Sequence, residues 1–179
     1  IRIGFGNDIH RLVPGRPLIL GGVEIESDLG AEGHSDADAL THAITDAIFG
    51  ALALGDIGSH FPNSDERWRD AESFVFLRFA VGEMKQHGYE IANVDSTVHL
   101  EHPKLRPYIV EIRKGLADAL EVETNQISVK AKTGEGVDAV GEQQDLDPLL
   151  AEHLQVRARL RREERVGSDV PDAVLAVLH

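Results

Sequence analysis

The sequence predicts one compact domain of the α+β class, with an α/β-like alternation, in which a mixed sheet packs against helices. Two observations predict this class. The 179 residues, 42% hydrophobic and 27% charged, have the size and composition of one domain that buries its own core. Along the chain, short patterns typical of strands alternate with longer helical ones. We therefore treat residues 1–179 as a single unit.

The N-terminal third is expected to contain two strands and a long helix. Apolar side chains alternate with polar or glycine positions in residues 1–10, and a second apolar run follows at 17–25. A helix is expected from Ser35, which can cap it, to about Leu54, with Gly55 ending it. These elements carry most of the residues that point to chemistry.

The middle of the chain continues the alternation. Its Gly, Pro, Asn and Ser content predicts a loop over residues 55–68. The elements expected after it are a helix at about 70–87, a strand at about 90–100, a helix at 107–120 and a short strand at 127–131.

The last strand has two possible placements. Residues 154–160 alternate apolar side chains with Gln or Arg, whereas residues 172–178 are almost entirely apolar. We expect the second placement, because a strand buried between a sheet and helices should be apolar on both faces. Residues of about 143–170 would then be an atypical insert that forms an outer helix or a loop.

Composition excludes several classes of partner. The net charge of −13 argues against nucleic acid and against anionic membranes, which both attract basic surfaces. No apolar stretch has the length of a membrane span, and the absence of Cys excludes thiolate metal sites. No export leader is visible at the first residues. We expect a soluble cytoplasmic bacterial protein, or a plastid protein if a transit peptide has been removed.

The spacing of carboxylates and imidazoles predicts a metal site. Asp8 and His10 lie two apart on an expected strand, so both point to one face. On the expected helix, one stripe carries His34, Asp38, His42 and Asp46 at successive spacings of four. Two strand ligands and one helix histidine would hold zinc with an open fourth position. Either helix Asp could accept the other imidazole N–H of the ligand histidine.

Purely structural interpretations of these residues remain open. An isolated D-x-H pair is more often a surface or capping pair than a metal site. Gly4 and Gly6 can simply allow close backbone packing, and the TGEG segment at 133–136 suits either a phosphate cradle or a plain turn.

Five ordered motifs resemble one family. They are G-x-G-x-D-x-H at 4–10, HSDAD with H and TD at 34–46, GDIG with FP at 55–62, HPK at 102–104 and KAKTGE at 130–135. Together, over residues 1 to about 141, they resemble the 2-C-methyl-D-erythritol 2,4-cyclodiphosphate synthases of the non-mevalonate isoprenoid pathway.

The resemblance implies a homotrimer with active sites at subunit interfaces. The implied reaction converts 4-diphosphocytidyl-2-C-methyl-D-erythritol 2-phosphate to the 2,4-cyclodiphosphate with loss of CMP. Asp8, His10 and His42 would ligate zinc, and Glu135 would hold Mg²⁺ or Mn²⁺ on the diphosphate. Thr133 would contact the diphosphate near the leaving group.

The resemblance also implies a set of substrate-binding residues. The phosphate-binding residues would be His34, Ser35 and Lys132. Those for the methylerythritol phosphate would be Asp56, Gly58, Phe61 and Asn63. Those for the cytosine, supplied by a neighbouring subunit, would be Leu100, Lys104, Leu105, Arg106 and Ala131. Without the resemblance, Phe61 and Leu105 suit the core equally well.

Two departures and two rival functions accompany the resemblance. Asn63 stands where the family usually has Asp, and Glu142 stands where an Arg is expected beside the central cavity of the trimer. One rival is a zinc phosphohydrolase in which Asp38 or Asp46 serves as base. The other is a trimeric scaffold protein without activity.

Overall fold

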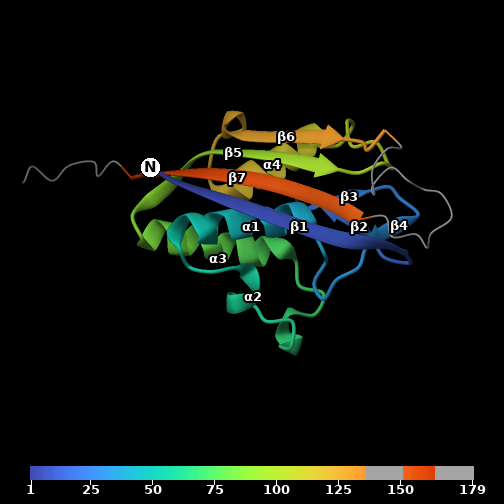
Figure 1. Cartoon of the computed structure of the whole chain (residues 1–179), viewed down its shortest axis with the longest axis horizontal. Helices are drawn as coiled ribbons and strands as arrows, with labels where there is room; N and C mark the ends of the chain where they lie inside the picture. The colour runs from blue at the N-terminus through green and yellow to red at the C-terminus, as the bar shows by residue number, and fades with distance from the viewer. Residues whose placement is uncertain (136–150, 164–179) are drawn as a thin grey trace, which may run out of the picture.

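The computed structural model describes residues 1–135 and 151–163, and its centre is a five-stranded sheet (Figure 1). The strands lie in the order β4-β1-β7-β5-β6. Their bounds are β1 Arg2–Pro14, β4 Leu29–Ala31, β5 Tyr89–His99, β6 Ile127–Lys132 and β7 Ala151–Arg162. The pair β5 and β6 is parallel, whereas the other neighbours are antiparallel. The expected mixed sheet and α+β class are therefore confirmed.

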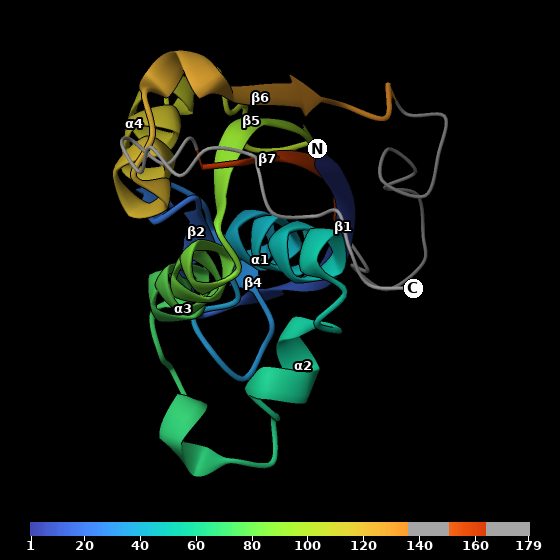
Figure 2. The ribbon, with the colours of Figure 1, turned by 90° about the vertical axis from the view of Figure 1, so that its left-hand side faces the viewer.

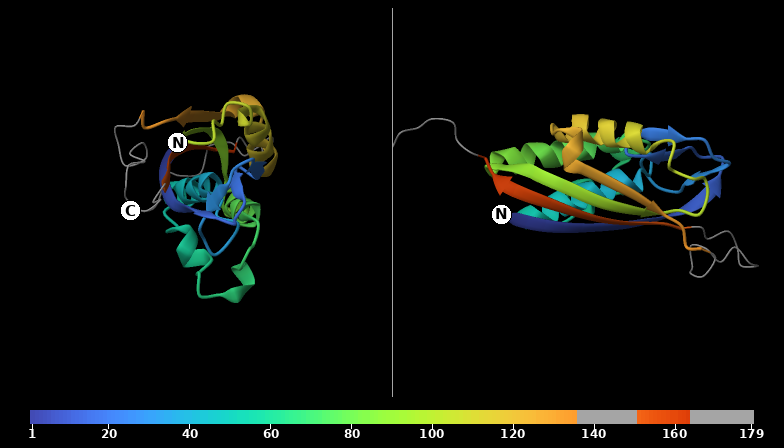
Figure 3. Two further views of the ribbon diagram at one scale, coloured as in Figure 1. Left: turned by 90° about the vertical axis from the view of Figure 1, so that its right-hand side faces the viewer. Right: turned by 90° about the horizontal axis from the view of Figure 1, so that it is seen from above.

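The helices lie on one side of this sheet. Their bounds are α1 Ala39–Leu52, α2 Ile57–His60, α3 Ser73–Gln86 and α4 Ile109–Leu120, with 3₁₀ turns at Glu66–Trp68 and Thr124–Gln126. The sheet curves round α1, α3 packs beside α1, and α4 lies near β6 (Figure 2). Seen from above, β1, β7 and β5 run side by side along the molecule (Figure 3). Among the described residues, no helix has the length and apolar character that crossing a bilayer requires.

The apolar run at 17–25 forms a hairpin and not the single strand we expected. Strand β2, Leu18–Leu20, pairs with β3, Val23–Ile25, across Gly21 and Gly22. Both glycines have positive φ, at 58° and 74°, which a two-residue hairpin turn favours and which glycine adopts without strain.

Helix α1 begins later than expected. Its N-cap is Asp38, whose side chain accepts the N–H of Thr41, and Ser35 lies outside the helix. Ala37 has φ of 58°, in the left-handed region, so the chain cannot be helical across it. Asp38 is fully buried and also accepts the N–H groups of Gly21 and Gly22. It therefore joins α1 to the hairpin turn.

The placement of the last strand at 172–178 was wrong. The sheet takes its central strand from β7, Ala151–Arg162, which pairs with β1 on one side and β5 on the other. Residues 151–162 are therefore not part of an outer insert. Leu154, Val156, Ala158 and Leu160 of β7 are fully buried, while its arginines at 157, 159 and 161 are exposed, because described helices cover only one face of the sheet. Residues 172–178 lie outside the described residues, as does Glu142.

Two glycines bring α1 directly against β1. A Cβ on Gly4 would lie 1.7 Å from the carbonyl oxygen of Ala47, and one on Gly6 would lie 1.8 Å from that of Ala43. Such distances are far below van der Waals contact, so only glycine fits at either position. The close approach places the side of α1 next to the following residues of β1, where the expected ligands lie.

Candidate metal centre and substrate pocket

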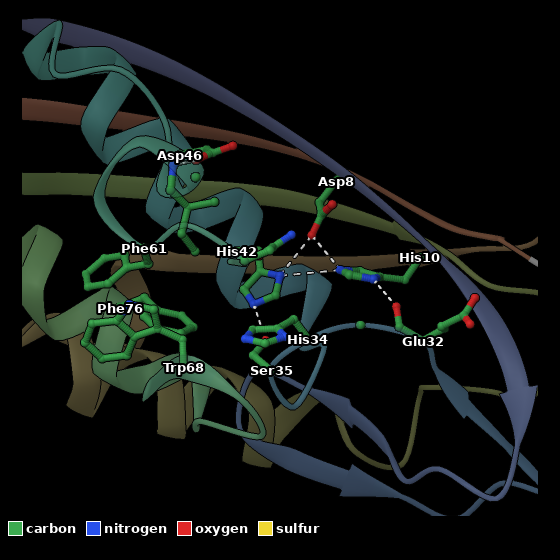
Figure 4. A pocket seen from close by; sticks show the side chains of 14 residues that line it. Asp8, His10, Glu32, His34, Ser35, His42, Asp46, Phe61, Trp68 and Phe76 are labelled. Atoms are coloured by element: carbon green, nitrogen blue, oxygen red, sulfur yellow. Dashed lines mark hydrogen bonds and ion pairs between the residues drawn. The ribbon is translucent and has the colours of Figure 1, made fainter. Parts of the chain in front are cut away.

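The three predicted zinc ligands converge on one point. Asp8 and His10 project from the helix-facing side of β1, and His42 projects toward them from the first turn of α1 (Figure 4). The Asp8 Oδ2 atom lies 3.1 Å from His10 Nε2 and 3.1 Å from His42 Nδ1. The two ring nitrogens are 3.4 Å apart. The chain thus forms a three-ligand group without help from another subunit.

This group suits zinc by both donor type and geometry. Two imidazoles and one carboxylate are common zinc ligands, and three of them leave a fourth position open for a substrate oxygen. Atoms bound at about 2.0–2.1 Å to a tetrahedral ion lie about 3.4 Å from one another. The separations of 3.1 to 3.4 Å match that arrangement closely.

Local contacts determine which nitrogen of His10 carries the ring proton and keep Asp8 ionised. The Nδ1 of His10 lies 2.7 Å from the carbonyl oxygen of Glu32, which can only accept, so His10 carries its proton there and presents Nε2 to the site. Burial alone would raise the pKa of Asp8. Hydrogen bonds and charges from His10 and His42 outweigh burial and hold that pKa well below its ordinary value. Asp8 is therefore an ionised ligand at neutral pH.

The outer partner of His42 differs from our expectation. Its Nε2 lies 2.8 Å from the hydroxyl of Ser73 and 3.2 Å from that of Ser35, not beside a carboxylate. Asp38 serves as the buried cap of α1, as described above. Asp46 accepts the N–H of Ile57 at 2.7 Å. The sequence did not indicate Ser73 as a partner of His42, because Ser73 lies 31 residues away and in another helix.

A cavity of about 380 Å³ opens beside Asp8, His10 and His42. Five further residues expected in the site line it, namely His34, Ser35, Gly58, Phe61 and Asn63, with Asp46 also on its wall. Its apolar side adds three residues that the sequence did not indicate, namely Ile57, Trp68 and Phe76. The ring centroid of Phe61 lies 4.7 Å from that of Phe76 and 5.0 Å from that of Trp68. Phe61 is thus both a core residue and a pocket wall.

The pKa values of two acidic residues beside the pocket shift in opposite directions. Burial raises the pKa of Asp46, and the nearby charges of Asp56 and Asp8 add to this effect. The Asp56 carboxylate is exposed and caps α2, accepting the N–H and the hydroxyl of Ser59, which lower its pKa. Asp56 is not among the residues that line the cavity.

The remaining expected site residues gather at a separate place. These residues are Leu100, Lys104, Leu105, Arg106, Ala131, Lys132, Thr133 and Glu135. They lie at or just beyond the carboxyl ends of β5 and β6, where the Leu100 N–H donates to the carbonyl of Lys132. The side chains of Leu100 and Leu105 are buried in the core.

Within one chain the two groups do not meet. Strands β7 and β5 separate β1 from β6, so β1 and β6 lie about 14 Å apart at ordinary strand spacing. Among the described residues, none from 100–106 or 131–135 lines the metal pocket. In the second group, the Thr133 hydroxyl donates to Glu135, and the Gly134 N–H donates to the Glu101 carboxylate.

Comparison with known proteins assigns the chain to a family. The sequence profile of the YgbB family matches residues 1–151. The chain belongs to the YgbB family. A relative named 2-C-methyl-D-erythritol 2,4-cyclodiphosphate synthase, from Salinibacter ruber, is 54% identical over 155 residues, which cover 87% of this chain and 99% of that protein. A relative of the same name from Solibacter usitatus is 57% identical, covering 79% and 89%. The resemblance expected from the motifs is confirmed.

Solved structures agree with this YgbB membership. One structure of 2C-methyl-D-erythritol-2,4-cyclodiphosphate synthase is 38% identical with a TM-score of 0.80, and covers 89% of this chain and 100% of that chain. The CDP complex of IspF from Plasmodium falciparum is 34% identical with a TM-score of 0.77, covering 91% and 97%. The fold of the chain is therefore the fold of these synthases.

Proposed function

We propose that this chain is a 2-C-methyl-D-erythritol 2,4-cyclodiphosphate synthase. It converts 4-diphosphocytidyl-2-C-methyl-D-erythritol 2-phosphate to the cyclic diphosphate and CMP. The convergence of Asp8, His10 and His42 beside a pocket carries this proposal, because a metal centre with an open position is suited to polarising a phosphoryl oxygen of a diphosphate. The 54% identity to a synthase over nearly its whole length supports it.

In the reaction, an oxygen of the 2-phosphate attacks the β-phosphorus, and the bond from that phosphorus to the oxygen of the CMP phosphate breaks. Attacking and leaving groups belong to one molecule, so the protein needs no covalent nucleophile and acts by positioning and charge neutralisation. His34 and Ser35 lie on the pocket wall next to the ligands and would hydrogen-bond a phosphate. Phe61, Trp68 and Phe76 form the apolar side that excludes water.

Zinc held by Asp8, His10 and His42 would supply a Lewis acid that polarises a phosphoryl oxygen and offsets its charge. Local positive charge matters here, since the chain carries a net charge of −13. Lys104, Arg106 and Lys132 would add cationic side chains, and Glu135 would hold a Mg²⁺ or Mn²⁺ ion that would offset the charge of the diphosphate.

The active form is proposed to be a homotrimer with interfacial sites. Within one chain, the residues for the cytosine and the second metal lie apart from the pocket, so each pocket would be completed by the 100–106 and 131–135 segments of a neighbour. Exposed apolar side chains at position 1, just before β1, and at positions 3, 5 and 9 along it support an interface on the outer face of the sheet.

The test combines metal analysis with product analysis. The protein, given zinc, Mg²⁺ and the cytidyl substrate, should release CMP and the cyclic diphosphate. His42→Ala should lose zinc and lower kcat/KM by more than the roughly 100-fold that loss of an outer hydrogen bond costs. His87→Ala is the control, because this exposed residue lies at the end of α3, where its Nδ1 is 2.8 Å from the carbonyl oxygen of Glu83, and it does not line the pocket.

Two outcomes would contradict the proposal. Full activity of zinc-free His42→Ala protein would remove the metal from the reaction. Release of inorganic phosphate in place of CMP would indicate a phosphohydrolase, for which Asp46 is the available base on the pocket wall.

A further inference from the structure

Ser73 contacts the metal ligand His42 on the side away from the metal. Its hydroxyl oxygen lies 2.8 Å from His42 Nε2, while Nδ1 of the same ring faces Asp8 and His10. Ser73 is the first residue of α3 and is 1% exposed. The hydroxyl is thus sealed from bulk water, and the described residues around it decide which way its proton points.

Asp36 fixes the direction of that hydroxyl. One carboxylate oxygen of Asp36 accepts the N–H of Ser73 at 2.9 Å, and the other accepts the N–H of Asp38 at 3.2 Å. The second oxygen also receives the Ser73 hydroxyl in a short hydrogen bond. A carboxylate that accepts from these donors offers lone pairs only, so the hydroxyl proton of Ser73 is committed to Asp36.

The tautomer of His42 follows from this direction. Because Ser73 donates its proton to Asp36, its oxygen can only accept from the imidazole. Nε2 of His42 must then carry the ring proton, which leaves the lone pair of a neutral imidazole on Nδ1. Nδ1 is the nitrogen that lies 3.1 Å from Asp8 Oδ2.

We propose that Ser73, oriented by Asp36, is the positioning residue for His42. It holds the ring in the tautomer and orientation that present Nδ1 to the metal. His10 uses the opposite nitrogen, because the carbonyl of Glu32 takes its Nδ1 proton. The inference rests on the metal site of the proposed function.

Ser35 is the weaker partner of the same nitrogen. Its hydroxyl lies 3.2 Å from His42 Nε2, against 2.8 Å for Ser73, and it already accepts the N–H of Ala37. With Ser73 receiving the imidazole proton, the Ser35 hydroxyl keeps its own proton for a substrate phosphate on the pocket wall.

The first test uses the wild-type protein. Long-range ¹H–¹⁵N spectra of the zinc-bound protein, with labelled histidine, should show a proton on His42 Nε2 and zinc on Nδ1. A proton on Nδ1 with zinc on Nε2 would overturn the inference. Failure of the wild-type protein to bind zinc would instead contradict the metal site of the proposed function, so the two failures are distinguishable.

The second test measures zinc affinity by competition with a chelator. Ser73→Ala should bind zinc about 10- to 100-fold more weakly, the usual cost of losing an outer hydrogen bond to a ligand. Ser73→Thr keeps a hydroxyl and should restore most of the affinity. Ser96→Ala is the matched control, since Ser96 is equally buried and donates to the Ser128 carbonyl in the sheet.

The variants also have a readout that separates positioning from general stability. In zinc-bound Ser73→Ala, the Nε2 and ring-proton signals of His42 should shift and broaden because the Nε2–H has lost its nearer acceptor, whereas Ser96→Ala should leave them unchanged. Wild-type affinity together with unchanged His42 signals in Ser73→Ala would overturn the inference. If Ser73→Ala does not fold, the wild-type spectrum and the affinity of Ser73→Thr decide it.

Discussion

At the scale of single residues, Asp46 couples the pocket to the stability of the chain. Burial raises its pKa, helped by Asp56 and Asp8 and opposed by the N–H of Ile57 and by His42. The folded chain therefore holds the Asp46 proton more tightly than the unfolded chain does, between the ordinary Asp value of about 3.9 and the raised value. In that window the contribution of Asp46 to stability falls as pH rises.

Asp46→Asn tests this coupling in the metal-free protein. The amide oxygen can still accept the N–H of Ile57, but the buried charge is gone. The variant should be more stable than wild type at pH 7, and the difference should vanish below about pH 4. Urea unfolding at both pH values measures it. Asp56→Asn should show the opposite sign, because the pKa of Asp56 is lowered. A difference for Asp46→Asn that is the same at both pH values would contradict the assignment.

Residue spacing and the family resemblance together predicted the ligands but not their outer partners. Strand periodicity paired Asp8 with His10, spacings of four pointed to a histidine of the expected helix, and the resemblance selected His42. Ser73 has no such relation to His42, since only the packing of α3 on α1 brings them together. Outer partners are tertiary contacts, so one sequence without the fold does not reveal them.

At the scale of elements, the contact of α1 with β1 determines whether the site forms. Gly6→Ala would place a Cβ 1.8 Å from the Ala43 carbonyl oxygen, so α1 must retreat and carry His42 away from Asp8 and His10. We expect a loss of about 1–3 kcal/mol or more in the free energy of unfolding, together with weaker zinc binding. Thermal unfolding and chelator competition measure the two effects.

Gly82→Ala provides the control for this substitution. Gly82 lies inside α3, and a Cβ there would meet no atom within 4 Å apart from the backbone of its own helix and its chain neighbours, so alanine should leave zinc binding unchanged and add about 0.5–1 kcal/mol of stability. Unchanged zinc affinity in Gly6→Ala would show that the close packing does not position the ligand.

The elements differ in how far the sequence could predict them. Helices α3 and α4 and strand β5 match the expected ranges closely, because each has a clear periodicity. Strand β7 was misplaced because we assumed that the last strand would be buried on both of its faces. Its pattern, with buried Leu154 and Val156 between exposed polar residues, is that of a strand covered on one face. Whether a strand has this pattern depends on which elements pack against each face of the sheet. The local sequence of the strand does not reveal those elements.

At the scale of the whole molecule, the outer face of β1 and the divided site point to the same assembly. Ile1, which precedes β1, is 75% exposed. Ile3, Phe5 and Ile9 of β1 are 70%, 56% and 58% exposed, and they alternate with the buried or ligand-bearing positions of the strand. A row of apolar side chains on one strand is a surface that association would bury. The same association would bring the second group of site residues to a neighbour's pocket.

The double substitution Ile3→Arg with Phe5→Arg tests the proposed trimer. Charges on this face should repel and remain hydrated, so the protein should become monomeric in sedimentation experiments. Zinc binding should persist, because Asp8, His10 and His42 come from one chain. CMP formation should be lost, because no neighbour supplies residues 100–106 and 131–135. Val110→Arg, 75% exposed on α4, should remain trimeric and active. A monomeric double variant that still forms CMP would contradict the interfacial site, and a trimeric one would place the interface elsewhere.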